Sequence, residues 1–160
     1  MPPGPEGALE GSVMPSSGTA QSDDTSPDDD SAAVPQSPEA TGLAQEDIVL
    51  LARLITAEAG GQPYEGQVAV GAVVMNRIAS GLFASTVKGV VFQPGQFEVV
   101  RNGRINMTPT ETALKAAQAA ARGEDPTDGA LYFFNPAKTS NRFLWSRPLK
   151  IVIGNHRFTS

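Results

Sequence analysis

One carboxyl group stands out among the residues whose type and position could support catalysis. Glu58 follows Leu51 by seven residues and Ile55 by three, so the three share one face of a helix. Glu58 also falls in the last turn of that helix, just before Gly60. An apolar face and the negative end of the helix dipole both disfavour the carboxylate, so both raise the pKa of Glu58. Such a glutamic acid can donate a proton near neutral pH, as cleavage of a glycosidic bond requires.

The spacing leaves a plainer interpretation open, in which Glu58 is a partly buried residue at a helix end that pairs with an arginine. Glu65 is a second carboxyl group nearby, at the start of the next helix, where the positive end of the dipole favours a carboxylate. The two carboxyl groups could serve as an acid and a base or nucleophile around one helix–loop–helix corner. For Glu65, the simpler role is that of a partner for the helix dipole.

Other kinds of catalytic chemistry have little support in the composition. The chain has no cysteine and one histidine, His156, which excludes a thiol nucleophile, a disulfide framework and a His-rich metal centre. His156 follows a turn and is interpreted as a solvated or packing residue. No nucleophile elbow, phosphate loop, dinucleotide fingerprint or paired metal spacing is present, so we expect neither a cofactor nor a metal.

The charges divide the chain into two parts. Ten acidic residues and no Lys or Arg lie in the stretch that ends at Asp47, whereas the rest holds seven acidic residues and all twelve Lys and Arg. Residues 1–44 are rich in Pro, Ser and Asp and lack aromatic residues, which favours a disordered acidic tail or linker. Residues 45–160 are predicted to form one catalytic domain. The sequence shows no apolar run of membrane-spanning length and no signal peptide.

The elements that must position Glu58 can be read from helix signals and turn signals. The Gly60-Gly61 pair ends the first helix, Gly81 ends the second, and Thr108-Pro109-Thr110-Glu111 has the spacing of a capping box with Pro109 first in its helix. The small residues of the second helix, Gly71 among them, allow close packing. The predicted helices cover residues 45–59, 63–80, 86–91 and 109–122, and 93–96 form a turn.

Short strands are predicted late in the chain. Residues 130–134 form an apolar strand, and residues 149–153 and 156–159 flank Gly154-Asn155, which is typical of a tight hairpin. The sequence therefore predicts an α+β domain, with a helical body and a small late antiparallel β-sheet.

Long motifs of the domain resemble a known family. They are LARLITAEAGGQPYEGQVAVGAVVMNR from Leu51, GVVFQPGQF from Gly89, DPTDGALYFFNP from Asp125, and WSRP from Trp145 with IGNHRF from Ile153. Together they resemble the catalytic domain of spore cortex-lytic enzymes, in the germination-type cell wall hydrolase family. The resemblance covers residues 46–160.

The resemblance implies a lysozyme-like fold and the cleavage of peptidoglycan between N-acetylmuramic acid and N-acetylglucosamine. In the manner of lytic transglycosylases, Glu58 would act as general acid and then as base, while the muramoyl C6 hydroxyl attacks and leaves a 1,6-anhydro end. Glu65 is then not needed for the chemistry. The matching blocks imply that substrate contacts come from Gln93, Gln96, Phe97, Tyr132 and Asn135.

Two positions depart from the family pattern. Phe134 stands where relatives often carry Tyr or His, and Glu98 stands where they often carry a small hydroxyl residue. If relatives use a hydroxyl group at the position of Phe134 to hold the sugar, Tyr132 must supply that hydroxyl group here. Glu98 could be a surface residue without a role, or it could perturb Glu58. These departures leave open an inactive relative that serves as a cell-wall glycan-binding module.

The expected partner is peptidoglycan of the cell wall or spore cortex, bound by a monomer located at the cell wall, outside the cytoplasm or on the spore. This location follows from the substrate alone. Aromatic residues interleave with the basic residues late in the chain, which would also suit a nucleic acid. The net charge of the domain is only modestly positive, so we expect no nucleic-acid partner and no membrane span.

Overall fold

The structure is a computed structural model that describes residues 43–160. The prediction of a disordered tail over residues 1–44 therefore lies outside the described residues, apart from Leu43 and Ala44, of which Leu43 packs against the core. No helix in the described range has both the length and the apolar character needed to cross a membrane. The helices are α2 (Gln45–Ala59), α3 (Tyr64–Ser80), α4 (Val87–Val91), α5 (Glu98–Arg101), the 3-10 helix η3 (Arg104–Asn106), α6 (Glu111–Ala121) and α7 (Arg142–Ser146).

The sheet is built from the last part of the chain. Its strands are β1 (Tyr132–Phe134), β2 (Leu149–Ile153) and β3 (His156–Thr159), arranged antiparallel in the order β1-β3-β2. The central strand β3 pairs with β1 in a register that sets Phe133 opposite Phe158. Gly154 adopts a φ of 58° in the turn between β2 and β3, a left-handed conformation that glycine accepts readily. The predicted hairpin and the predicted α+β class are both confirmed.

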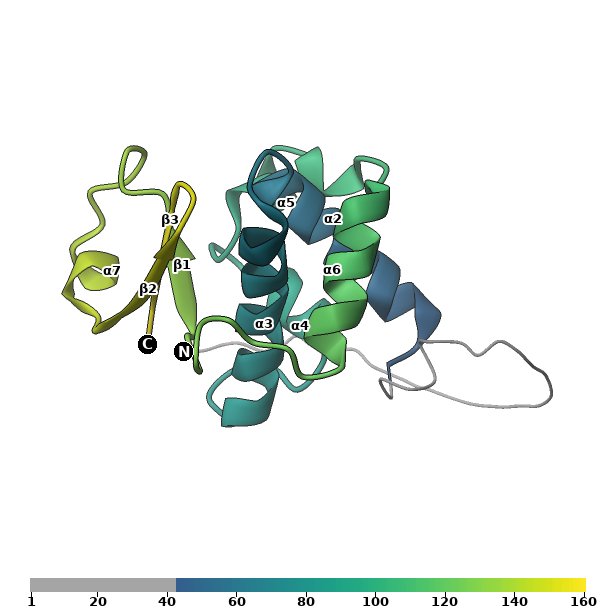
Figure 1. Ribbon diagram of the computed structural model, residues 1–160, viewed down its shortest axis with the longest axis horizontal. Coiled ribbons are helices and arrows are strands. Elements are labelled where there is room, and N and C mark those ends of the chain that lie inside the picture. Colours follow the sequence, from purple (N-terminus) through teal and green to yellow (C-terminus); the bar gives the residue numbers. More distant parts are fainter. Residues whose placement is uncertain (1–42) are drawn as a thin grey trace, which may run out of the picture.

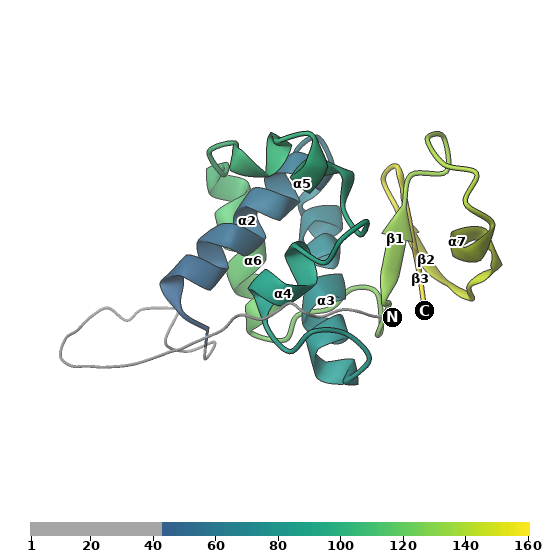
Figure 2. The same cartoon turned by 180° about the vertical axis from the view of Figure 1, so that it is seen from behind.

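The molecule has a helical end and a sheet end (Figure 1). Helices α2, α3 and α6 pack together at the helical end, while the sheet and α7 form the other end. The view from behind shows the same division, with α3 as the helix of the helical end that lies nearest to β1 in both views (Figure 2). The end of α2 that carries Glu58 and the start of β3 thus belong to opposite ends of the fold, and a site between them needs contributions from both.

Close packing of α3 on α6 confirms the role expected for its small residues. A Cβ atom added at Gly71 would lie 2.8 Å from the Cβ of Ala120 and 3.2 Å from Cδ1 of Ile55. Helix α6 could make room only by a shift of its backbone, because the nearest atom is the Cβ of Ala120, a short and buried side chain. Glycine at this position therefore sets how closely the helices approach.

We expect Gly71→Val to destabilise the fold by about 1–3 kcal/mol, the usual cost of overpacking a filled core. Urea denaturation of the variant and the parent measures this difference. Gly61→Ala is the matched control, because a Cβ at Gly61 would meet nothing within 4 Å. Equal stability of Gly71→Val and the parent would show that the α3–α6 contact has room to spare.

The structure corrects some boundaries and adds short helices. Helix α6 begins at Glu111 with Thr110 as its N-cap, so the predictions of Thr108 as the cap and Pro109 as the first helical residue are wrong. The Thr110 side chain accepts a hydrogen bond from the backbone N–H of Ala113 at 3.0 Å, and its own N–H donates to Oγ1 of Thr56. This bond to α2 holds Thr110 at the cap. Helices α5, η3 and α7 were not predicted.

Candidate active site

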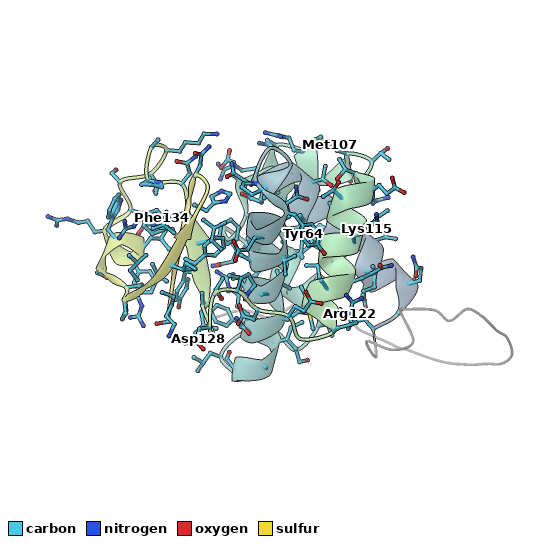
Figure 3. All side chains as sticks on the ribbon, in the orientation of Figure 1. Tyr64, Met107, Lys115, Arg122, Asp128 and Phe134 are labelled. Atoms are coloured by element: carbon cyan, nitrogen blue, oxygen red, sulfur yellow. The ribbon has the colours of Figure 1, made fainter. Side chains whose placement is uncertain are left out.

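A pocket of about 680 Å³ lies between the helical end and the sheet. Its wall includes the end of α2, residues 95–99, β1 with the loop that follows it, and the start of β3. Figure 3 shows side chains from both ends of the molecule meeting in the space between α3 and the sheet. The sequence-predicted residues that line this pocket are Glu58, Gln96, Phe97, Tyr132 and Asn135.

Glu58 lies at the pocket wall in the last turn of α2, where no basic residue follows it. Burial raises the pKa of Glu58 above its ordinary value, and this desolvation is the largest influence on it. Among residues 43–160, no side chain forms a salt bridge with Glu58. The alternative in which Glu58 pairs with an arginine at a helix end therefore has no support, and its carboxyl group remains available to a ligand.

Three charged residues of the pocket adjust the pKa of Glu58 in opposite directions. Arg104 and Lys138 lower the pKa because they favour the carboxylate, whereas Glu98 raises it. Glu98 is exposed and forms an ion pair with Arg101. The departure from the family pattern at Glu98 thus places a second carboxylate in the pocket wall that strengthens the effect of burial on Glu58.

A buried arginine in the pocket wall holds neighbouring residues of the site in place. Arg77 on α3 donates from Nε to the carbonyl oxygen of Leu131 at 2.7 Å and from Nη1 to Oε1 of Gln96 at 3.0 Å. Its guanidinium lies 5.5 Å from the centre of the Phe97 ring and 5.4 Å from that of Tyr132. Burial lowers the pKa of Arg77 to about 10, so it stays protonated at neutral pH. One side chain therefore fixes three predicted site residues, a role that the sequence pattern did not indicate.

The β1 strand and Asn135, the residue after it, supply another part of the pocket wall. Tyr132 packs edge-on against Phe143 with ring centres 5.3 Å apart, and Oδ1 of Asn135 accepts a hydrogen bond from the N–H of Ala137. Phe134 also lines the pocket but is buried, and its ring packs against Trp145 of α7. Figure 3 labels Phe134 at the sheet end. The ring of Phe134 is therefore engaged in packing. Tyr132 is the residue of this strand that has a hydroxyl group in the pocket wall.

Two of the residues considered from the sequence lie outside the pocket wall. Gln93 closes a turn instead, where its carbonyl oxygen accepts a hydrogen bond from the N–H of Gln96 at 3.2 Å. Glu65 is exposed in the first turn of α3, as a partner of the helix dipole would be. The pairing of Glu58 with Glu65 as acid and base has no geometric support, because only Glu58 reaches the pocket.

His156 lies in the same pocket, although its sequence position suggested a solvated or packing residue. It is buried at the start of β3, and its ring packs edge-on against Phe133 with centres 5.3 Å apart. Burial lowers the pKa of His156, and the charge of Lys138 lowers it further. The ring is therefore neutral at physiological pH. Among the described residues, no cluster of His, Asp and Glu has the arrangement of a metal site.

The helical body, the late antiparallel sheet and the pocket between them define a lysozyme-like α+β domain with a protonatable glutamic acid in its cleft. Residues 61–159 match the family described as Cell Wall Hydrolase. This match covers more than half of the chain, and the chain belongs to the cell wall hydrolase family.

Relatives and solved structures agree with this assignment. The chain is 48% identical over 117 residues to a spore cortex-lytic enzyme of Bacillus cereus, in a match that covers 73% of this chain and 45% of the relative. The corresponding enzyme of Bacillus subtilis is 47% identical over 117 residues, which is 73% of this chain and 38% of that one. The chain thus spans less than half the length of either relative.

Solved structures also match at the level of the whole fold. One of them is the catalytic domain of the germination-specific lytic transglycosylase SleB from Bacillus anthracis, with a TM-score of 0.71 and 45% sequence identity. The match covers 79% of this chain and all of that domain, 100%. The described part of the chain therefore corresponds to a complete catalytic domain of that enzyme.

Proposed function

We propose that residues 45–160 cleave the glycan strand of peptidoglycan between N-acetylmuramic acid and N-acetylglucosamine, as a lytic transglycosylase. Glu58 gives its proton to the glycosidic oxygen while the bond from that oxygen to the anomeric carbon breaks. The C6 hydroxyl oxygen of the muramoyl residue then attacks the anomeric carbon, and its proton returns to Glu58. The product has a 1,6-anhydro end, no water is consumed, and Glu58 is ready for another cycle.

The observation that carries this proposal is a desolvated carboxyl group in the wall of a pocket of about 680 Å³. A raised pKa keeps Glu58 protonated at a pH where an ordinary glutamate has lost its proton, which is the state a general acid must start from. Glu98, the other carboxyl group in the pocket wall, is exposed and paired with Arg101, so it is a poor nucleophile. A mechanism with one carboxyl group suits this arrangement.

The substrate and location are part of the proposal. The relatives bear the name of spore cortex-lytic enzymes, and the matched structure is described as a germination-specific lytic transglycosylase, which supports cortex or cell-wall peptidoglycan as the partner. The protein then acts at the cell wall or in the spore, as a monomer and without a cofactor. Gln96, Phe97, Tyr132 and Asn135 contact the glycan in the pocket.

The direct experiment is to incubate the protein with purified sacculi and analyse the soluble products by mass spectrometry. We expect fragments with 1,6-anhydromuramic ends, each lighter by one water than the product of hydrolysis. Reducing muramic ends would show that water is the nucleophile and that the protein is a muramidase. If a folded protein released no fragments, the enzyme proposal would fail.

The same experiment decides between the enzyme and an inactive glycan-binding module. The departures at Phe134 and Glu98 are the observations that favour the module. A module retains sacculi in a pull-down without releasing fragments, whereas the enzyme releases them.

A further inference from the structure

The two ring nitrogens of His156 differ in what they can bind. Its Nδ1 atom is closed off from solvent and has no hydrogen-bond partner among the described residues. The ring lines the pocket that also holds Glu58, and Nε2 is the ring nitrogen that is not closed off in this way. Because Nδ1 is buried without a partner, a ligand in the pocket can form a hydrogen bond with His156 only through Nε2.

The surroundings of His156 determine which of its nitrogens carries the proton. Burial and the charge of Lys138 keep the ring neutral, so it holds a single proton. A buried N–H without an acceptor is rarer in folded proteins than a buried acceptor without a donor. The proton is therefore better placed on Nε2, which makes His156 a hydrogen-bond donor directed into the cavity.

An aromatic surface adjoins this donor. The rings of Phe97 and Phe133 stack with centres 6.1 Å apart, and Phe133 in turn contacts His156 edge-on. All three residues line the pocket. A donor next to an apolar ring surface complements an acetamido group, whose carbonyl oxygen accepts a hydrogen bond and whose methyl group packs on an aromatic face.

A hydrogen bond across the fold holds this arrangement in place. The backbone N–H of Asn155 donates to Oε1 of Gln62 at 2.8 Å, which ties the β2–β3 turn to the corner between α2 and α3. That corner follows Glu58 directly, so the residue before His156 is anchored close in sequence to the candidate acid. A side chain at Gly154 would disturb the contact, because its Cβ would fall 2.2 Å from the same Oε1 atom.

We infer that His156 is a glycan-contacting residue, which donates a hydrogen bond from Nε2 to the acetamido carbonyl oxygen of a sugar bound against Phe97 and Phe133. The inference rests on the proposed function, since it names the part of the substrate that this wall of the pocket holds. His156 fixes the position of the sugar in this arrangement and takes no part in moving the proton of Glu58.

Nuclear magnetic resonance tests this directly, because His156 is the one histidine of the chain and gives a single set of imidazole signals. The full chain with Glu58→Gln, prepared without a histidine tag, is titrated with the tetrasaccharide that repeats N-acetylglucosamine and N-acetylmuramic acid. We expect the nitrogen shifts to show the proton on Nε2, and the Nε2–H signal to move and exchange more slowly with water when the sugar binds.

Three outcomes of the titration are distinct. Movement of the imidazole signals together with those of Tyr132 supports the inference. Movement of the Tyr132 signals without the imidazole overturns the inference and leaves the proposed function standing. If no signal moves at saturating sugar concentration, the glycan does not bind, and both the inference and the proposed function fail.

A pair of variants gives an independent measure of the hydrogen bond. His156→Phe keeps an aromatic ring between Phe133 and Phe158, so the fold should survive while the donor is lost. In the Glu58→Gln background we expect it to bind the tetrasaccharide about three- to tenfold more weakly, the range for one neutral hydrogen bond. His156→Gln returns an N–H donor and should recover part of this loss.

The acetamido group is tested with the same variants and the de-N-acetylated tetrasaccharide. With this ligand, His156→Phe and its parent should bind equally well. The ligand has no acetamido carbonyl oxygen, so neither protein can form the hydrogen bond. An equal loss with both ligands would overturn the assignment to the acetamido group. Unchanged affinity of His156→Phe for the acetylated sugar would overturn the inference as a whole.

Discussion

Glu58→Gln should slow the release of fragments from sacculi by about a hundredfold to ten-thousandfold, because general acid catalysis is worth about 10²–10⁴. Glutamine keeps the shape of the side chain and its polarity, but it has no proton acidic enough to give to the glycosidic oxygen. Binding of sacculi should persist, since the pocket wall is unchanged. Fragment release by the purified variant at even a tenth of the parent rate would rule out Glu58 as the general acid.

The loss cannot be attributed to unfolding if the variant is as stable as the parent. Desolvation raises the pKa of Glu58, so folding favours its proton, and the stability that this proton provides is lost as the pH rises through the raised pKa. Glutamine stays neutral at every pH. At pH 8 the variant should therefore match or exceed the parent in urea denaturation, by up to about 2 kcal/mol. Glu65→Gln, which changes an exposed carboxyl group outside the pocket, should cleave like the parent.

Local signals were strong enough to predict the corner that carries Glu58. Gly81 ends α3 in a left-handed conformation and Pro63 directly precedes α3, while Gly60 follows the last residue of α2, so the bounds of α2 and α3 follow from the sequence within a residue or two. The cap of α6 was misplaced because Thr108 and Thr110 offer the same hydroxyl group. The bond between Thr110 and Thr56 of α2 decides between them, and that contact belongs to the tertiary structure.

The sequence of helix α7 lacks the periodic apolar residues that predict α2. None of its residues is buried, so it shows no periodic apolar face. It is held instead by an N-cap, since Oδ1 of Asn141 accepts from the N–H of Leu144, and by the packing of Trp145 on Phe134. Such short exposed helices depend on contacts with the rest of the fold, which sequence periodicity does not record.

The candidate acid could be predicted from the sequence, but its surroundings could not. Helix spacing places Glu58 on the apolar face and in the last turn of α2, and the resemblance to the family implies its role as the acid. His156 becomes a pocket residue only when β3 pairs with β1 and the turn at Asn155 bonds to Gln62. Arg77 likewise acquires its role only when α3 meets Gln96 and Leu131. The site is thus assembled from long-range contacts around one locally specified residue.

The alkaline side of the pH–activity profile should report the pKa of Glu58. Above that pKa, kcat/KM for fragment release should fall about tenfold for each pH unit, because the catalytic proton has been lost. Since burial raises the pKa of Glu58, activity should extend to a higher pH than an ordinary glutamic acid would allow. A short soluble glycan is the preferred substrate, because its own charge does not change over the range measured.

Two variants of the pocket wall should move this alkaline limb in opposite directions. Arg104 favours the carboxylate of Glu58, so Arg104→Gln should raise its pKa and shift the limb to higher pH. Glu98 disfavours the same carboxylate, so Glu98→Gln should shift the limb to lower pH. Arg122→Gln is the control, because Arg122 is exposed, pairs with Glu124 and lies outside the pocket wall. Shifts of both pocket variants in the same direction would mean that the limb belongs to a group other than Glu58.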